Sequence, residues 1–137
     1  MAEIKISELS IGDWVRHTFY EENLQIKRID GESERLLVEK GLMSVSCHLD
    51  HFEPIPLTPE ILEKNGFRKL DRFNEYVIGE WDSNPFIAVR LAEKMVEPTI
   101  LVKNEGTSAH LFGPLGENVH QLQHVLRLAG VEKEIEV

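Results

Sequence analysis

Glu53-Pro-Ile-Pro-Leu-Thr-Pro-Glu-Ile-Leu-Glu-Lys-Asn-Gly-Phe67 is the stretch that decides how this 137-residue chain is organised. Its three prolines remove backbone donors and favour extended backbone before each of them, so we expect a strand to end here. Thr58 is suited to cap a helix that starts at Pro59, and Gly66 is suited to end that helix. The stretch therefore predicts a strand end followed by a helix of about two turns.

The residues before this stretch predict about five short strands separated by turns. Val15, His17 and Phe19 are expected to share one face of the first strand. In the next strand a change of parity near Lys27 and Arg28 predicts a β-bulge or an end of strand pairing. Closely spaced strands of this kind favour a small SH3-like β-barrel or a strongly curled sheet, with a flat meander as the alternative.

The residues after the stretch predict an antiparallel meander and a C-terminal helix. The expected strands cover residues 76–81, 86–91 and 99–103, and turn-forming residues bound each of them. Residues 132–137 form an acidic tail that is expected to be an edge strand or to fray. The helix should bury an apolar stripe with spacings of three and four residues. That stripe consists of Leu115, Val119, Leu122, Leu126 and Ala129, widened by Val125 and Leu128.

These patterns together predict an α+β protein. We expect a small β-barrel-like subdomain over residues 1–57 and an α+β subdomain over residues 58–137, the two sharing one core. The single cysteine, Cys47, excludes an intramolecular disulfide. No apolar run approaches the length of a membrane span, so we expect a cytoplasmic protein without a membrane segment.

The balance of charge counts against a general nucleic-acid binder. Fifteen basic and 24 acidic residues give a formal net charge of −9, whereas neutralisation of phosphate dominates affinity for DNA and RNA. A local binding face remains a hypothesis for the expected barrel, because aromatic and basic side chains there suit peptide binding or base stacking. The residues of this face are Trp14, Arg16, Tyr20, Lys27 and Arg28. Its aromatic residues are alternatively a second core surface that packs against the helical half.

His120 and His124 lie four residues apart on the expected helix, which is the spacing at which two imidazoles can hold one metal ion. Gln121 stands where the H-E-x-x-H zinc motif has its glutamate, and a carboxamide cannot serve as the general base of a hydrolase. A helical projection places both histidines opposite the apolar stripe, on a solvated surface. We therefore expect no metal and no cofactor, with His120 and His124 as the candidates if one binds, joined by His48 or His110.

Cys47, His48 and His51 form a second group of residues whose types suit zinc binding or nucleophilic catalysis. Adjacent residues of a strand point to opposite faces, so Cys47 is expected inward and His48 outward. A buried cysteine behaves as a small hydrophobic residue. The chain also contains no phosphate-binding loop, nucleophile elbow or EF-hand loop. The sequence thus nominates no catalytic residue.

Three blocks resemble a recurring group of short uncharacterised bacterial proteins that are often found in prophage or mobile-element regions. The blocks cover residues 9–15 (L-x-I-G-D-x-V), 54–67 and 119–123 (V-H-Q-L-Q), so the resemblance extends over nearly the whole length. It implies a shared fold with a β-rich N-terminal part, a proline-led helix and a C-terminal helix, and it brings no activity to transfer. Members of the group often carry an acidic residue at the position of Gln121 and often lack the second histidine, which argues against His124 as a metal ligand.

The function that the sequence favours is a non-catalytic protein-interaction or accessory protein of prophage type. Its binding surface is expected on the N-terminal barrel or in the groove between the barrel and the C-terminal half. One alternative is a nucleic-acid-associated accessory factor that uses the aromatic and basic face of the barrel. A metal-dependent enzyme that uses His120 and His124 is the third hypothesis.

Overall fold

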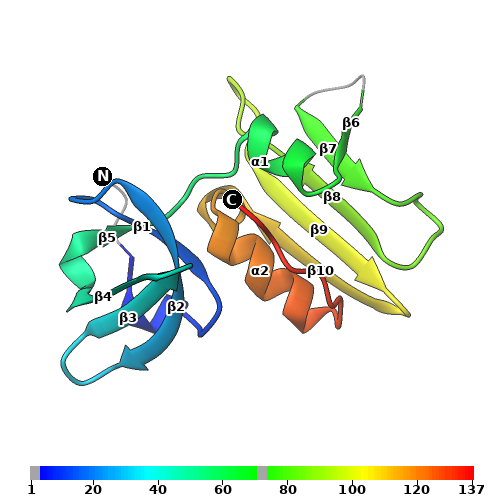
Figure 1. The fold of residues 1–137 in the computed structure, drawn as a ribbon. Helices are drawn as coiled ribbons and strands as arrows, with labels where there is room; N and C mark the ends of the chain where they lie inside the picture. The colour runs from blue at the N-terminus through cyan, green and yellow to red at the C-terminus, as the bar shows by residue number, and fades with distance from the viewer. Residues whose placement is uncertain (1–3, 71–73) are drawn as a thin grey trace. The chain divides into compact units, whose positions relative to one another are not determined.

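The structure is a computed structural model that describes residues 4–70 and 74–137 (Figure 1). The chain divides into two compact units, Met1–Ile55 and Pro56–Val137. The division falls within the proline-rich segment, where the backbone has few donors to offer to either sheet. The core shared by both parts, which the sequence suggested, stays a prediction.

The first unit is an antiparallel five-stranded sheet with the strand order β4-β3-β2-β1-β5. The sheet curls strongly, as Figure 1 shows, so the curled-sheet prediction is confirmed. The register of β2 against β3 shifts between Ile26 and Arg28, where the sequence predicted a bulge. Its elements are η1 (Ile6–Glu8), β1 (Trp14–His17), β2 (Glu22–Asp30), β3 (Arg35–Lys40), β4 (Met43–His48), η2 (Leu49–His51) and β5 (Phe52–Glu53).

Alternate residues of these strands build the core of the first unit. The inward side chains belong to β-branched and leucine residues, which suit a pleated and half-buried surface. The fully buried ones are Val15, Leu24, Ile26, Leu36 and Val38. Burial of these side chains is the main source of stability for the unit.

The prediction that Phe19 shares the buried face of β1 is wrong. The strand ends at His17, and the chain then turns, with Glu21 at a positive φ of 53° and its N–H bonded to the carbonyl of His17. Phe19 lies in this turn and is 78% exposed. The alternation of inward and outward side chains therefore ends at His17, two residues before Phe19.

The second unit is an antiparallel five-stranded sheet with the order β10-β9-β8-β7-β6 and two helices. Its first element is α1 (Pro59–Lys64), in which the N–H of Ile61 donates to the Oγ1 of Thr58, as the predicted N-cap requires. Thr107–Phe112 form a strand that the sequence did not predict. The strands are β6 (Arg68–Lys69), β7 (Glu75–Ile78), β8 (Phe86–Arg90), β9 (Thr99–Asn104) and β10 (Thr107–Phe112).

The C-terminal helix α2 (Val119–Leu128) follows η3 (Gly113–Gly116) and starts later than the apolar stripe suggested. Leu115 and Leu128 are exposed, so the stripe is wrong at these two positions, whereas its other residues are buried as predicted. Gln121 explains the start, because its Oε1 accepts from the N–H groups of Glu117 and Asn118 in a capping box. Within the described residues, no helix has the length and apolar composition needed to cross a bilayer.

The acidic tail is held against the second unit, so the prediction of an edge strand or a frayed end is wrong. Asn65 at the end of α1 donates from Nδ2 to the carbonyl of Glu136 and accepts from its N–H at Oδ1. Ile135 is buried beside this pair of bonds. The carboxamide of Asn65 thus holds a segment more than 70 residues away in the sequence, together with the Nζ of Lys64, which donates to the carbonyl of Val137.

Candidate functional site

Strand parity divides the second sheet into two faces. The covered face carries Ile87, Val89, Ile100 and Val102, all fully buried, and both helices lie on this side in Figure 1. Burial, together with Glu63 and Glu60 of α1, raises the pKa of Tyr76 on the same face. The opposite face, here called the open face, consists of Val77, Phe86, Ala88, Leu101, Lys103, Ser108, His110 and Phe112.

A groove of about 380 Å³ lies on the open face. Buried Val77 and Phe86 form its floor, together with half-buried Ala88 and Leu101. Trp81, from the loop between β7 and β8, stands at its side and is 65% exposed. The groove is therefore an apolar depression flanked by an accessible indole ring.

Trp81 is exposed and yet firmly held. The loop that carries it closes on itself, since the N–H of Glu80 donates to the Oγ of Ser83 and the N–H of Ser83 donates to the carbonyl of Glu80. The Nζ of Lys103 lies 3.8 Å from the centroid of the indole ring, in a cation–π contact. Phe86 contacts the ring edge-on, with centroids 5.4 Å apart.

The charged groups around the groove are paired with one another. The Nη2 of Arg68 lies 3.1 Å from the Oε1 of Glu80 and also donates to the carbonyl of Gly79. Arg90 and Glu75 approach to 3.9 Å. Exposed pairs of this kind add little stability, and their effect here is to leave the rim nearly neutral.

The structure brings together only part of the aromatic and basic face that the sequence suggested for the first unit. Trp14, Arg16 and Arg28 point away from the core on the outer side of the curled sheet, as their pairing with Gln25, Asn23 and Leu37 shows. Arg16 is engaged by Glu53, with its Nε 3.3 Å from the carboxylate Oε1.

The other two residues of that set lie outside the regular strand pairs. Tyr20 lies in the turn after β1, where its ring packs on His17 with centroids 4.6 Å apart. Lys27 occupies the bulge between Ile26 and Arg28. Tyr20 therefore lies outside the strand pairs that carry Trp14, Arg16 and Arg28.

A contact that the sequence did not predict joins His17 and Cys47 inside the curled sheet. The Nε2 of His17 lies 3.5 Å from the Sγ of Cys47, and only 2% of His17 is exposed. The Nδ1 of the same ring accepts from the N–H groups of Phe19 and Tyr20 at 3.2 Å each. The neutral imidazole therefore carries its proton on Nε2 and directs it toward sulfur.

This arrangement does not suit a catalytic cysteine–histidine pair. A general base must accept the thiol proton, whereas the Nε2 of His17 already bears one. Burial lowers the pKa of His17, and the nearby ring of His51 lowers it further. The pair is best understood as a polar contact within the first core, with Cys47 inward as the sequence predicted.

The placement of His120 on a solvated helix surface is wrong. His120 is 2% exposed, and neighbouring Gln123 is buried as well, so burial around α2 extends beyond its apolar stripe. The rings of His120 and His124 meet edge to face with centroids 5.8 Å apart. Among the described residues, no group of three or more His, Cys, Asp or Glu side chains is arranged to hold a metal ion. Absence of a bound metal stays a prediction.

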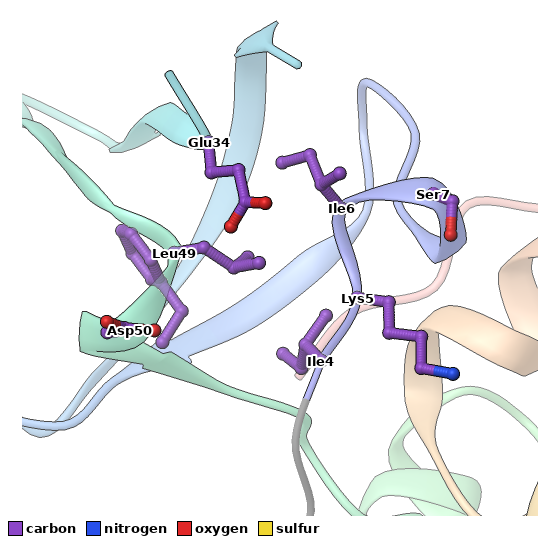
Figure 2. A pocket seen from close by; sticks show the side chains of 8 residues that line it. Ile4, Lys5, Ile6, Ser7, Glu34, Leu49 and Asp50 are labelled. Carbon is purple, nitrogen blue, oxygen red and sulfur yellow. The ribbon is translucent and has the colours of Figure 1, made fainter. Parts of the chain in front are cut away.

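A second hollow, of about 560 Å³, lies beside the N-terminal segment of the first unit. Figure 2 shows the side chains of Ile4, Ile6 and Leu49 turned into it from two segments, while Lys5 points away. Glu34, Ser7 and Asp50 also line it. Its polar groups do not converge on one point, so the hollow offers no chemistry of its own.

Comparison of this chain with models of protein families, with curated proteins and with solved structures finds no match. The resemblance of three sequence blocks to short prophage-type proteins therefore stays a prediction.

Proposed function

We propose that this is a non-catalytic protein-interaction or accessory protein of the cytoplasm, of prophage type, and that its open face binds a partner protein. The groove receives an apolar side chain of that partner beside Trp81. The observation that carries the proposal is an exposed tryptophan held rigidly at the edge of an apolar groove.

The open face suits protein binding both because it offers an exposed apolar surface and because little conformational entropy is lost there on binding. Exposed apolar patches on a folded protein commonly mark interaction sites, and tryptophan is enriched among the residues that dominate binding energy. Contacts from Lys103 and Phe86 restrict the indole before any partner arrives. Less conformational entropy is then lost on binding.

Charge around the groove selects the kind of partner. Arg68 and Arg90 are engaged by Glu80 and Glu75, and the floor of the groove is apolar. A phosphate backbone needs several available cations, whereas an aliphatic or aromatic side chain needs a neutral surface. The groove therefore suits a partner that places an uncharged side chain at the centre of the interface.

Binding by the outer face of the first unit is the second candidate, and it corresponds to a nucleic-acid-associated accessory factor. It is favoured by one observation, the placement of Trp14, Arg16 and Arg28 on the same side of the sheet. Salt-dependent binding of single-stranded DNA or RNA, lost in an Arg28→Glu variant, would support it. Absence of binding at low salt would exclude it.

The test of the proposal begins with affinity capture from the native host, followed by purification of each captured protein and measurement of its Kd with the isolated chain. Trp81→Ala and Leu101→Glu are expected to weaken binding at least tenfold, about 1.4 kcal/mol or more. Leu42→Glu, at a fully exposed position in the β3–β4 turn of the first unit, is the matched control and should leave the Kd unchanged. Equal affinities for all three variants would contradict the proposal.

A further inference from the structure

The two sheets have four edges: two are very short, and the third, β4, has six residues without proline or a charged side chain but has one outward carbonyl engaged by an arginine. β5 and β6 contain only two residues each. On β4, the Nη2 of Arg35 donates to the outward carbonyl of Ser46 at 3.2 Å. The fourth edge, β10, has six residues and contains no proline, no bulge and no charged side chain. Natural proteins usually avoid an edge of this kind, because it invites another strand.

The backbone groups that β10 offers can be identified from its pairing. Thr107 lies opposite Asn104, and the N–H of Gly113 donates to the carbonyl of Pro98, so residues of odd number face β9. Ser108, His110 and Phe112 therefore direct their N–H and C=O groups outward. Among the described residues, no other segment forms a main-chain hydrogen bond with these three.

We propose that β10 pairs antiparallel with β10 of a second copy of this chain, with His110 opposite the partner's His110. This register places Ser108 opposite the partner's Phe112, so every outward group of both strands finds a partner. A small residue then meets a large one, and the rings of His110 and Phe112, whose centroids lie 4.0 Å apart, form the centre of the contact. No other antiparallel register of the two strands uses all three outward residues.

Charge favours a second copy despite the net charge of −9. Like charges opposite each other destabilise a pair of strands, but residues Thr107–Phe112 include no acidic or basic side chain other than His110. The strand is thus a neutral segment of an acidic protein. Pairing would join the two sheets into one of ten strands, with both open faces on the same side. Because no residue of β10 lines the groove beside Trp81, this inference does not rest on the proposed partner site.

The experiment is light scattering coupled to size exclusion, which should give twice the chain mass of 15.7 kDa at micromolar concentration. His110→Pro removes an outward N–H that β9 does not use, so the fold should persist while the mass falls to that of one chain. His110→Lys places two ammonium groups opposite each other and should also give the single-chain mass. Ser46→Pro is the matched control at an outward position of β4, and it should leave the doubled mass unchanged.

A chemical cross-link locates the contact. In a Cys47→Ser background, His110→Cys treated with a short bis-maleimide should give a covalent dimer, whereas Lys69→Cys on the opposite edge should not. A wild-type mass of one chain up to 100 µM would overturn the proposal, and so would a dimer that both His110→Pro and His110→Lys leave intact. If His110→Pro fails to fold by circular dichroism, His110→Lys and the cross-link decide the question.

Discussion

The Nε2 of His17 lies 3.5 Å from the Sγ of Cys47, although β1 and β4 are separated by two other strands in the order of the sheet. The contact exists because the sheet curls until its first and fourth strands face each other across the core. Two backbone N–H groups hold the Nδ1 of His17, which fixes the proton on Nε2. A buried imidazole at this position makes the first unit sensitive to acid.

The pH dependence of stability follows from the lowered pKa of His17, which burial causes first and His51 second. The unfolded chain, with a histidine pKa of about 6.5, binds a proton before the folded chain does. The contribution of His17 is therefore complete above that value and is lost as the pH falls below it, by at most about 1.4 kcal/mol per pH unit. Urea unfolding between pH 7.5 and 5 should show a steeper loss for the wild type than for His17→Gln. An NMR titration in which His17 protonates before the exposed histidines would contradict this account.

Gly79 holds the loop that carries Trp81, and alanine should not fit there. Its φ is +83°, and an added Cβ would lie 2.6 Å from the carbonyl oxygen of Pro85 and 2.7 Å from the Oγ of Ser83. Gly79→Ala should lower the free energy of unfolding by about 1–3 kcal/mol. Gly31→Ala, where no atom lies within 4 Å and φ is not positive, is the control and should change it by less than about 0.5 kcal/mol. Equal changes in the melting temperature of Gly79→Ala and Gly31→Ala would contradict the claim that the loop carrying Trp81 is tightly held.

Asn65 should be sensitive to loss of its amide nitrogen. Its Nδ2 donates to the carbonyls of Ile61 and Glu136, and aspartate cannot replace these bonds. Asn65→Asp should cost about 1–3 kcal/mol, because buried acceptors lose their donor. Asn84→Asp is the matched control. Asn84 accepts from the N–H of Glu105 through its Oδ1, and aspartate keeps that acceptor. Chemical denaturation of both variants gives the comparison, and a tail that stays protected from hydrogen exchange in Asn65→Asp would contradict the assignment.

Gln121 should act in helix capping, and His120 in packing, without a metal ion. Gln121→Ala removes acceptors for two N–H groups and a donor to the carbonyl of Pro114, so it should cost about 1 kcal/mol. Treatment with a chelator should leave the melting temperature of the untagged wild type unchanged. Stoichiometric zinc in that preparation, together with a fall in melting temperature on chelation, would restore the metal hypothesis.

Local chemistry predicted much of the fold. The Thr58 cap, the bulge near Lys27 and the alternation along β4 are each decided by a few neighbouring residues, and the structure shows all three. β10 escaped prediction because the alternation of apolar and polar residues along it is weak. The burial of His120 was not predicted because a helical projection takes account only of the residues of the helix itself and not of the elements packed around it.

Little of the candidate site could be predicted. Trp81 stands in a loop between two strands, and its significance comes from Lys103 and Phe86, which reach it through pairing within the sheet. The His17–Cys47 contact depends on the curl of the first sheet, and no sequence pattern specifies how far a sheet curls. Tyr20 was proposed as a binding residue from its residue type alone, and in the structure it lies in a turn and packs on His17.

The most direct test of the central claim, that the open face of the second unit binds a partner protein, is site-specific photo-cross-linking in the native host. A photoreactive side chain at Leu101, on the open face, is expected to give a defined covalent adduct with one partner. The same side chain at Glu39, on the outer side of the first sheet, should not. An adduct at Glu39 with none at Leu101 would contradict the account.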